Sequence, residues 1–249
     1  MIFTSFKTLS EAMSSSSLLP QSWTLENYSQ LFTETGDAPI GQWIVNTGIV
    51  TVVGTLLVVF VDVLAAYSLA RLNFPGKKKL VLTFIVAALT IPGIVTLFPA
   101  FFYLFKWLGL TDTFVPLILP YSAGTMGVFL VYNFLLSFPK ELEEAAHIDG
   151  ASQWRILVSV VFPSVRPAVL TLTVITFLNI YNDYLWPLLV VNSPEMKTVT
   201  TGLASLIQGA NFVNPAKMMA STVIATLPAL IIFSVLQPLF CQRSNGFGH

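Results

Sequence analysis

Five long apolar segments constrain the fold of this chain more than any other feature of its sequence. Each is long enough to cross a hydrocarbon core of about 30 Å as a helix. A soluble protein is nearly excluded, because 55% of the 249 residues are apolar and only 10% are charged, against roughly 25% charged residues in soluble domains. The predicted spans are residues 43–70, 80–105, 114–136, 167–191 and 218–240.

Lipid decides which secondary structure these segments adopt. Inside a bilayer, a backbone amide or carbonyl must bond within its own helix or within a closed barrel. Barrel strands alternate in polarity over about ten residues, and runs such as IVTVVGTLLVVFVDVLAAYSLA do not alternate. We therefore predict an all-α integral membrane protein, a polytopic helical bundle of five spans.

The basic residues of the loops predict the orientation, because Lys and Arg are enriched in cytoplasmic loops. If the first predicted span ends in the cytoplasm, residues 1–42 form an extracytoplasmic segment and 43–240 a transmembrane domain. The loop 137–166 and the tail 241–249 are then cytoplasmic. The basic residues inside are Arg71, Lys77, Lys78, Lys79, Lys140, Arg155, Arg166 and Arg243, and those outside are Lys7, Lys106, Lys197 and Lys217.

The loop 137–166 has the pattern of two short helices joined at a glycine. Gly150 can end the first helix without the steric cost of a β-carbon. Ser152 is suited to cap a second helix, which we expect Pro163 to end. Such a pair cannot bury both of its apolar faces, so we expect it to dock on a soluble cytoplasmic partner.

The same loop contains EAAHIDG, followed by nine residues and then VVFP. It resembles the EAA signature of ABC-importer permeases, which runs EAA, three residues, G, nine residues and I-x-L-P. In that family the loop is the coupling element, a pair of short helices seated in a cleft of the ATPase subunit. The resemblance implies an ATPase-coupling role for the matching residues, which are Glu144, Ala145, Ala146, Gly150 and Pro163.

Three other stretches are similar to the carbohydrate branch of that family, in particular to its maltose-transporter-type second permease subunit: SWTLENYSQLF, LAAYSLARLNFPGKK and NIYNDYLWPLLV. The resemblance covers nearly the whole chain. It implies a membrane-spanning permease subunit of an ATP-driven, binding-protein-dependent importer in a cell inner membrane, translocating a sugar or oligosaccharide by alternating access. The partners it implies are a second permease subunit, two cytoplasmic ATP-binding subunits, an extracytoplasmic solute-binding protein, the sugar and membrane lipid.

The sequence departs from that family at both ends. Family members usually have six spans with both termini inside, whereas this chain begins, at IFTSFKT, where their first span would be ending. We expect residues 1–6 to be the end of a missing first span. The tail QPLFCQRSNGFGH differs from the basic, glycine-containing tail that is usual in the family. Two other functions stay open: an ion-coupled secondary transporter using Asp62 and Asp183 as ligands, and an inactive truncated permease.

Polar residues within the fourth span form a candidate substrate path. Asn179, Asn182, Asp183 and Trp186 share one face at helical spacing, and aromatic rings with amide or carboxylate groups suit a sugar. An interfacial aromatic belt with polar contacts between helices is an equal alternative.

Asp62 stands in the middle of the first span. An ionised carboxylate there costs at least about 2.5 kcal/mol, so it should face the bundle interior or water. A role in a pathway or proton relay, and a protonated or subunit-interface role, are both compatible with this position.

The sequence predicts no enzyme activity, cofactor or metal site for this chain. His147 and His249 each lack a second ligand at metal-binding spacing. The chain contains no GxxxxGK[ST], GxSxG or HExxH motif, so we expect ATP hydrolysis in a partner subunit. Its 12 basic and 12 acidic residues cancel, which indicates no nucleic-acid partner.

Overall fold

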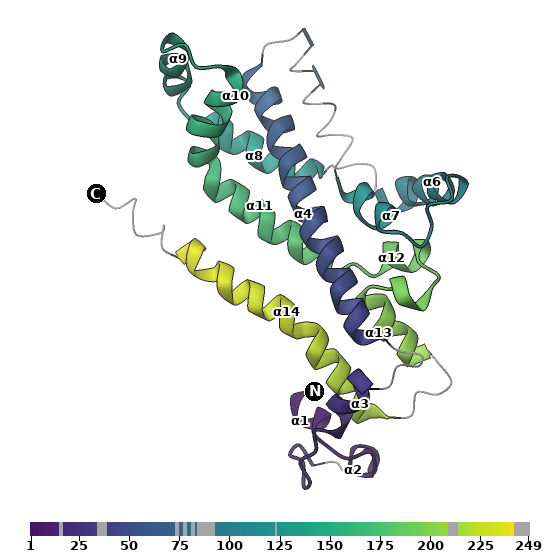
Figure 1. Ribbon diagram of the computed structural model, residues 1–249. Helices are drawn as coiled ribbons and strands as arrows, with labels where there is room; N and C mark the ends of the chain where they lie inside the picture. Colours follow the sequence, from purple (N-terminus) through teal and green to yellow (C-terminus); the bar gives the residue numbers. More distant parts are fainter. Residues whose placement is uncertain are drawn as a thin grey trace. The chain divides into compact units, whose positions relative to one another are not determined.

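The computed structural model describes residues 1–14, 17–33, 39–72, 75–76, 79–80, 83, 93–122, 124–208 and 214–241. All regular structure in these ranges is helical, which confirms the predicted all-α class (Figure 1). The elements up to the predicted loop are α1 (Ile2–Ser5), α2 (Leu9–Ser14), α3 (Glu26–Thr33), α4 (Ile40–Arg71), α6 (Gly93–Trp107), α7 (Phe114–Ile118), η1 (Leu119–Tyr121) and α8 (Thr125–Ser137). Those that follow are α9 (Glu141–Ile148), α10 (Gln153–Ile156), η2 (Leu157–Val161), α11 (Phe162–Asn182), α12 (Leu185–Val190), η3 (Pro194–Met196), α13 (Val199–Gln208) and α14 (Pro215–Cys241).

Three helical stretches of the described chain are long and apolar enough to cross a membrane: Ile40–Arg71, Phe114–Ser137 and Gln153–Asn182. The first two coincide with the predicted spans 43–70 and 114–136. The fifth predicted span lies on α14, of which Pro215–Ile231 forms a shorter apolar stretch. In the second predicted span, residues 81–82 and 84–92 lie outside the described ranges.

The predicted bounds of the fourth span, 167–191, are wrong. Its helix runs without interruption from Gln153 to Asn182, and α12 is a separate element. Pro187 explains the break, because it has no N–H to donate to the carbonyl of Asp183, four residues earlier. The hydroxyl of Thr200 donates to that carbonyl instead, at 2.6 Å.

The described contacts divide the chain into two compact units. The first comprises residues 1–51, 104–117 and 181–249, and the second comprises 52–103 and 118–180. α4 contributes its first part to one unit and its second part to the other.

In the first unit, the beginning of α4 is fixed to the segment that leads into α13. Trp43 is 1% exposed, and a β-carbon at Gly202 would overlap its indole ring, so the two helices can approach this closely only with glycine there. Polar side chains of α4 also bond the backbone of that segment: Trp43 Nε1 donates to Pro194 O (2.7 Å), Asn46 Nδ2 donates to Glu195 O (2.7 Å), and Thr47 Oγ1 accepts from the Val199 amide (2.8 Å).

The second unit has its own apolar core, formed by α4, α8 and the continuous helix that begins with α10. Small residues of α4 let the helices approach closely, as Ala66 and Ala70 are both buried. The other buried members are Val63, Tyr67, Val128, Val131, Leu135, Ile156, Leu157, Val161, Val165, Val169 and Leu172.

Asp112 holds the loop between α6 and α7 in the first unit. Its backbone has a φ of 60°, and its Oδ1 accepts hydrogen bonds from the amides of Asn192 (2.7 Å) and Ser193 (2.8 Å) and from the Ser193 hydroxyl (3.0 Å). Partial burial acts to raise the pKa of Asp112, but the hydrogen bonds from Ser193 and Asn192 outweigh it and hold the pKa below its ordinary value.

We expect Asp112→Ala to lower the free energy of unfolding by about 1–2 kcal/mol at neutral pH, because two amides lose a charged acceptor. A pKa that is depressed by folding stabilises the folded state above the unfolded pKa, and this contribution is lost as the pH falls through the folded pKa. The midpoint of thermal unfolding in detergent should therefore be lower for Asp112→Ala than for wild type at neutral pH, and this difference should be smaller in acid. Asp112→Asn, which keeps an acceptor oxygen, should lie between them; coincident unfolding of all three at neutral pH would contradict this role.

Candidate functional site

The turn after α9 explains the spacing of the EAA signature. Gly150 has a φ of +79°, a conformation that L side chains rarely adopt. The Ala151 amide donates to Ala146 O and the Gly150 amide donates to His147 O, each at 3.0 Å. This pair of bonds is a Schellman motif. In this motif the glycine lies four positions after the third-last residue of the helix, which is Ala146 here. Ala146 and Ala151 both pack against the core of the second unit, and the predicted helix end at Gly150 is confirmed.

The second helix of the loop begins as predicted but does not end as predicted. The Ser152 hydroxyl accepts from the Arg155 amide at 3.4 Å, which confirms the cap. Pro163 does not end the helix. The five residues of η2 form a π turn in which the Phe162 amide donates to Leu157 O. Such a turn lets a helix continue past a proline, which has no N–H to donate to the carbonyl four residues earlier. The loop helix therefore continues directly into α11.

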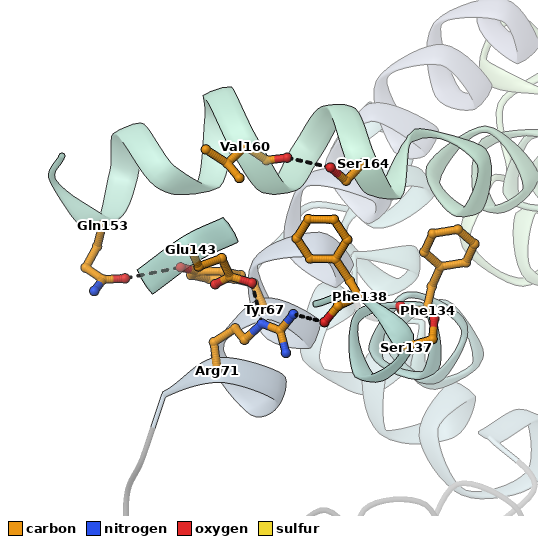
Figure 2. Close-up of polar contacts among 9 residues, drawn as sticks. All are labelled: Tyr67, Arg71, Phe134, Ser137, Phe138, Glu143, Gln153, Val160 and Ser164. Carbon is orange, nitrogen blue, oxygen red and sulfur yellow. Dashed lines mark hydrogen bonds and ion pairs between the residues drawn. The ribbon is translucent and has the colours of Figure 1, made fainter. Parts of the chain in front are cut away.

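A buried ion pair fastens the first loop helix to the end of α4. Arg71 Nε donates to Glu143 Oε1 at 2.6 Å, and the two side chains are 7% and 12% exposed. Arg71 Nη2 also donates to Phe138 O at 3.0 Å. Figure 2 shows the guanidinium of Arg71 between these two acceptors. One side chain of α4 thus holds both the end of α8 and the start of α9.

The second loop helix is fastened to α4 as well. The hydroxyl of Tyr67, one turn before Arg71, donates to Gln153 Oε1 at 3.1 Å (Figure 2). Ile156, one turn further along this helix, is 2% exposed in the core. Both loop helices are therefore fastened to the C-terminal end of α4.

The outer surface of the loop carries the predicted signature residues and several apolar side chains. Glu144, Ala145, Gly150 and Pro163 are exposed, whereas Ala146 is half-buried. The apolar side chains exposed with them are Leu142 (52%), Ile148 (87%) and Trp154 (60%). We call these three residues the apolar rim. Exposed apolar groups beside an acidic residue are suited to a protein partner.

Sequence reasoning missed Arg71, Glu143, Tyr67 and Gln153 as site residues. In the sequence, Arg71 contributed only to the predicted orientation, as one of the basic residues on the inner side, and Glu143 had no predicted role in the site. The available signal for this ion pair was an arginine in the last turn of a span together with a glutamate in the first turn of a loop helix. It is weak, because most such charges are solvated.

The predicted substrate-path residues do not share one helix face. α11 ends at Asn182, so Asp183 and Trp186 lie beyond it. Trp186 is fully buried, and its Nε1 donates to Pro116 O at 2.7 Å. Asp183 Oδ1 accepts from the Leu185 amide at 3.1 Å at the start of α12. Within the first unit both residues have structural contacts.

Asn179 and Asp62 meet at one cavity of the second unit. Its volume is about 400 Å³, and it is lined by α4, by the segment leading into α8 with the first turns of that helix, and by α11. Asp62 is fully buried and Asn179 is exposed at the cavity wall. In the part of the chain that the structure describes, no three His, Cys, Asp or Glu residues gather in a group suited to a metal ion.

Comparison with known proteins places the chain among membrane components of transport systems. The family profile described as "Binding-protein-dependent transport system inner membrane component" matches residues 62–245. The diacetylchitobiose uptake system permease of Streptomyces coelicolor is 34% identical over 239 residues, which are 95% of this chain and 78% of that protein. The maltodextrin transport system permease of Bacillus subtilis is 33% identical, over 91% of this chain and 81% of that protein.

The fold agrees with solved structures of a transporter. A chain of a bacterial ABC transporter that imports the acidic polysaccharide alginate superimposes with a TM-score of 0.81 at 21% identity, covering 96% of this chain and 88% of that one. A chain of a bacterial alginate ABC transporter in complex with its alginate-bound periplasmic protein gives a TM-score of 0.66 at 18% identity, over 89% of this chain and 84% of that one.

We expect Arg71→Met to release α9 from α4, because the substitution leaves the Glu143 carboxylate buried without its partner, at a cost of about 3–5 kcal/mol. Hydrogen exchange of peptides from residues 141–150 should accelerate, and Arg71→Met with Glu143→Gln should recover much of the protection. Arg155→Met, at an exposed position of the same loop, is the matched control. Equal exchange in Arg71→Met and the control would contradict the anchoring role.

Proposed function

The chain belongs to the binding-protein-dependent transport system inner membrane components, and we propose that the solute it conducts is a sugar or oligosaccharide. The observation that carries this proposal is the similarity to permeases named for diacetylchitobiose and maltodextrin, which extends over more than nine-tenths of this chain. Both of those solutes are oligosaccharides. A further relative, the arabinooligosaccharides transport system permease of Halalkalibacterium halodurans, supports the same class of solute.

Energy enters through the loop of α9 and α10, on which a cytoplasmic ATP-binding subunit docks. The apolar rim offers that subunit three exposed apolar side chains, and Glu144 and Ala145 are exposed on the same loop. The family match includes this whole loop. Docking would bury the rim and remove its apolar surface from water.

Two connections carry a movement of the loop into the membrane helices. The Arg71–Glu143 ion pair links α9 to α4, and the unbroken helix from Gln153 links α10 to α11. Because one connection is an ion pair of two largely buried side chains and the other an unbroken helix, closure of the ATP-binding subunits would shift both membrane helices together. Such a shift is what alternating access needs, since it exposes one solute path first to one side and then to the other.

The proposed assembly contains a second permease subunit, two ATP-binding subunits and an extracytoplasmic solute-binding protein. The sequence has no GxxxxGK[ST] phosphate loop, so ATP hydrolysis falls to the partner subunits. The chain lies in the cell inner membrane, with the loop 137–166 and the tail 241–249 in the cytoplasm. The excess of basic residues in the inner loops supports this orientation.

Asn179 and Asn182 of α11 are the residues of the predicted path that we place nearest the solute, since both are exposed. Trp186 does not contact the solute in this proposal, because its ring is buried and its N–H donates to Pro116 O. Asp183 likewise holds the start of α12.

We expect Ala145→Glu to abolish ATPase docking while leaving the fold intact. Ala145 is exposed, so a longer charged side chain there does not disturb the core but obstructs a partner in contact with the loop. Uptake of labelled maltotriose or diacetylchitobiose should fall at least about tenfold. Affinity purification from membranes should recover the second permease without the ATP-binding subunits.

Ala145→Ser adds an oxygen with little bulk and no charge, and it is the matched control that should retain both partners and uptake. If Ala145→Glu co-purifies with the ATP-binding subunits as wild type does and transports normally, the loop is not their docking surface.

A further inference from the structure

Asp62 carries a carboxylate oxygen that the fold leaves without a partner. The side chain is fully buried in α4. Its Oδ1 accepts from the amide of Gly124, the N-cap of α8, at 3.1 Å. Its Oδ2 accepts no hydrogen bond from the described residues. A buried unpaired carboxylate oxygen costs more than an unpaired hydroxyl, so this oxygen requires an explanation.

Two glycines make room for this carboxylate. A β-carbon at Gly127 would overlap Asp62 Oδ2, and one at Gly124 would lie 3.1 Å from it. The positive end of α8 also faces the acid, because Gly124 and Gly127 lie at the start of this 13-residue helix. The start of α8 is therefore shaped around a carboxylate that uses only one of its two oxygens.

The cavity beside Asp62 has the composition of a sugar site. Most of its wall is apolar, with side chains such as Phe129 and Leu172, and a few polar groups interrupt it, among them Thr176 and Asn179. Apolar and aromatic faces suit the C–H patches of a sugar ring, while a small number of acceptors and amides select its hydroxyls. Asp62 is the only acidic residue on the described wall, which disfavours a cation as the occupant.

We propose that Asp62 Oδ2 is an acceptor for a hydroxyl of the sugar in transit, and that it is uncovered when α8 moves away from α4 during the transport cycle. In this conformation Oδ2 is sealed from solvent, and the two α8 residues whose β-carbons would approach it, Gly124 and Gly127, carry no side chains. A small displacement of α8 opens the oxygen to the cavity. The inference rests on the proposed function, and it deepens that function by assigning a selective contact within the path.

Asp62→Asn separates this role from a purely structural one. An asparagine oxygen still accepts from the Gly124 amide, so the cap of α8 is kept, but the second oxygen becomes an N–H₂ donor. The experiment uses the complete importer in proteoliposomes, with maltotriose, diacetylchitobiose and arabinotriose as labelled probe sugars. We expect Asp62→Asn to assemble with all partners and to reduce uptake of the transported probe at least tenfold. Val53→Ile, a conservative change at an exposed position of α4 outside the cavity lining, is the control and should transport normally.

Accessibility of position 62 is measured independently of uptake. Cys241 is the only cysteine of the chain, so Asp62→Cys in a Cys241→Ser background gives one reactive thiol there. We expect a charged, water-soluble methanethiosulfonate to modify it at least tenfold faster in one of two states, nucleotide-free or vanadate-trapped, than in the other. Protection by the transported sugar is expected in the reactive state.

The uptake experiment and the labelling experiment can each overturn the inference. Uptake by Asp62→Asn within twofold of wild type would make Asp62 a structural cap, and absence of labelling in both states would remove it from the path. Both outcomes leave the proposed function standing if wild type transports a probe sugar. If wild type transports none of the three probes, the proposed function fails, and the acceptor role of Asp62 fails with it.

Discussion

Proline shapes the helices on both sides of α11 through the backbone donor that it lacks. Each proline inside a helix removes a hydrogen-bond donor, and where a helix lies in the hydrocarbon core no water is available to replace it. At Pro187 the helix stops, and the Thr200 hydroxyl bonds the carbonyl of Asp183 that the proline cannot serve. Before Pro163 the helix instead widens into a π turn and continues. These two solutions decide where α11 ends and how it continues from the loop of α9 and α10.

In the loop of α9 and α10, backbone geometry accounts for part of the sequence signature. The interval between Ala146 and Gly150 is the interval of a Schellman motif, so the turn requires the glycine, while Ala146 packs against the core of the second unit. The exposed members, Glu144 and Ala145, remain available for a partner. The anchoring of the same loop depends on Arg71, which lies about seventy residues earlier in the sequence.

The helical class, the first and third spans and the turn of the loop followed from the sequence, because they depend on local composition and on residues close in the chain. The end of α11 did not, because the Asp183 carbonyl that Pro187 cannot bond is bonded by the hydroxyl of Thr200, which lies outside the predicted span. Trp186 suited a sugar path by residue type, yet its N–H is bonded to Pro116 in a buried contact. The meeting of Asp62 with Gly127 likewise required the packing of α4 on α8. Contacts between distant residues thus account for most of what the sequence did not predict.

The continuity of the helix from Gln153 into α11 makes it a lever. From Gln153 to Asn179 the helix is about 40 Å long at 1.5 Å per residue. If the contact of Tyr67 with Gln153 acts as the fulcrum, a tilt of about 5° of this helix moves the position of Asn179 by about 3.5 Å over that length. A displacement of this size is comparable to the thickness of one layer of side-chain atoms. Under the proposed function, a small rotation of the loop would thereby be amplified into a change in the width of the solute path.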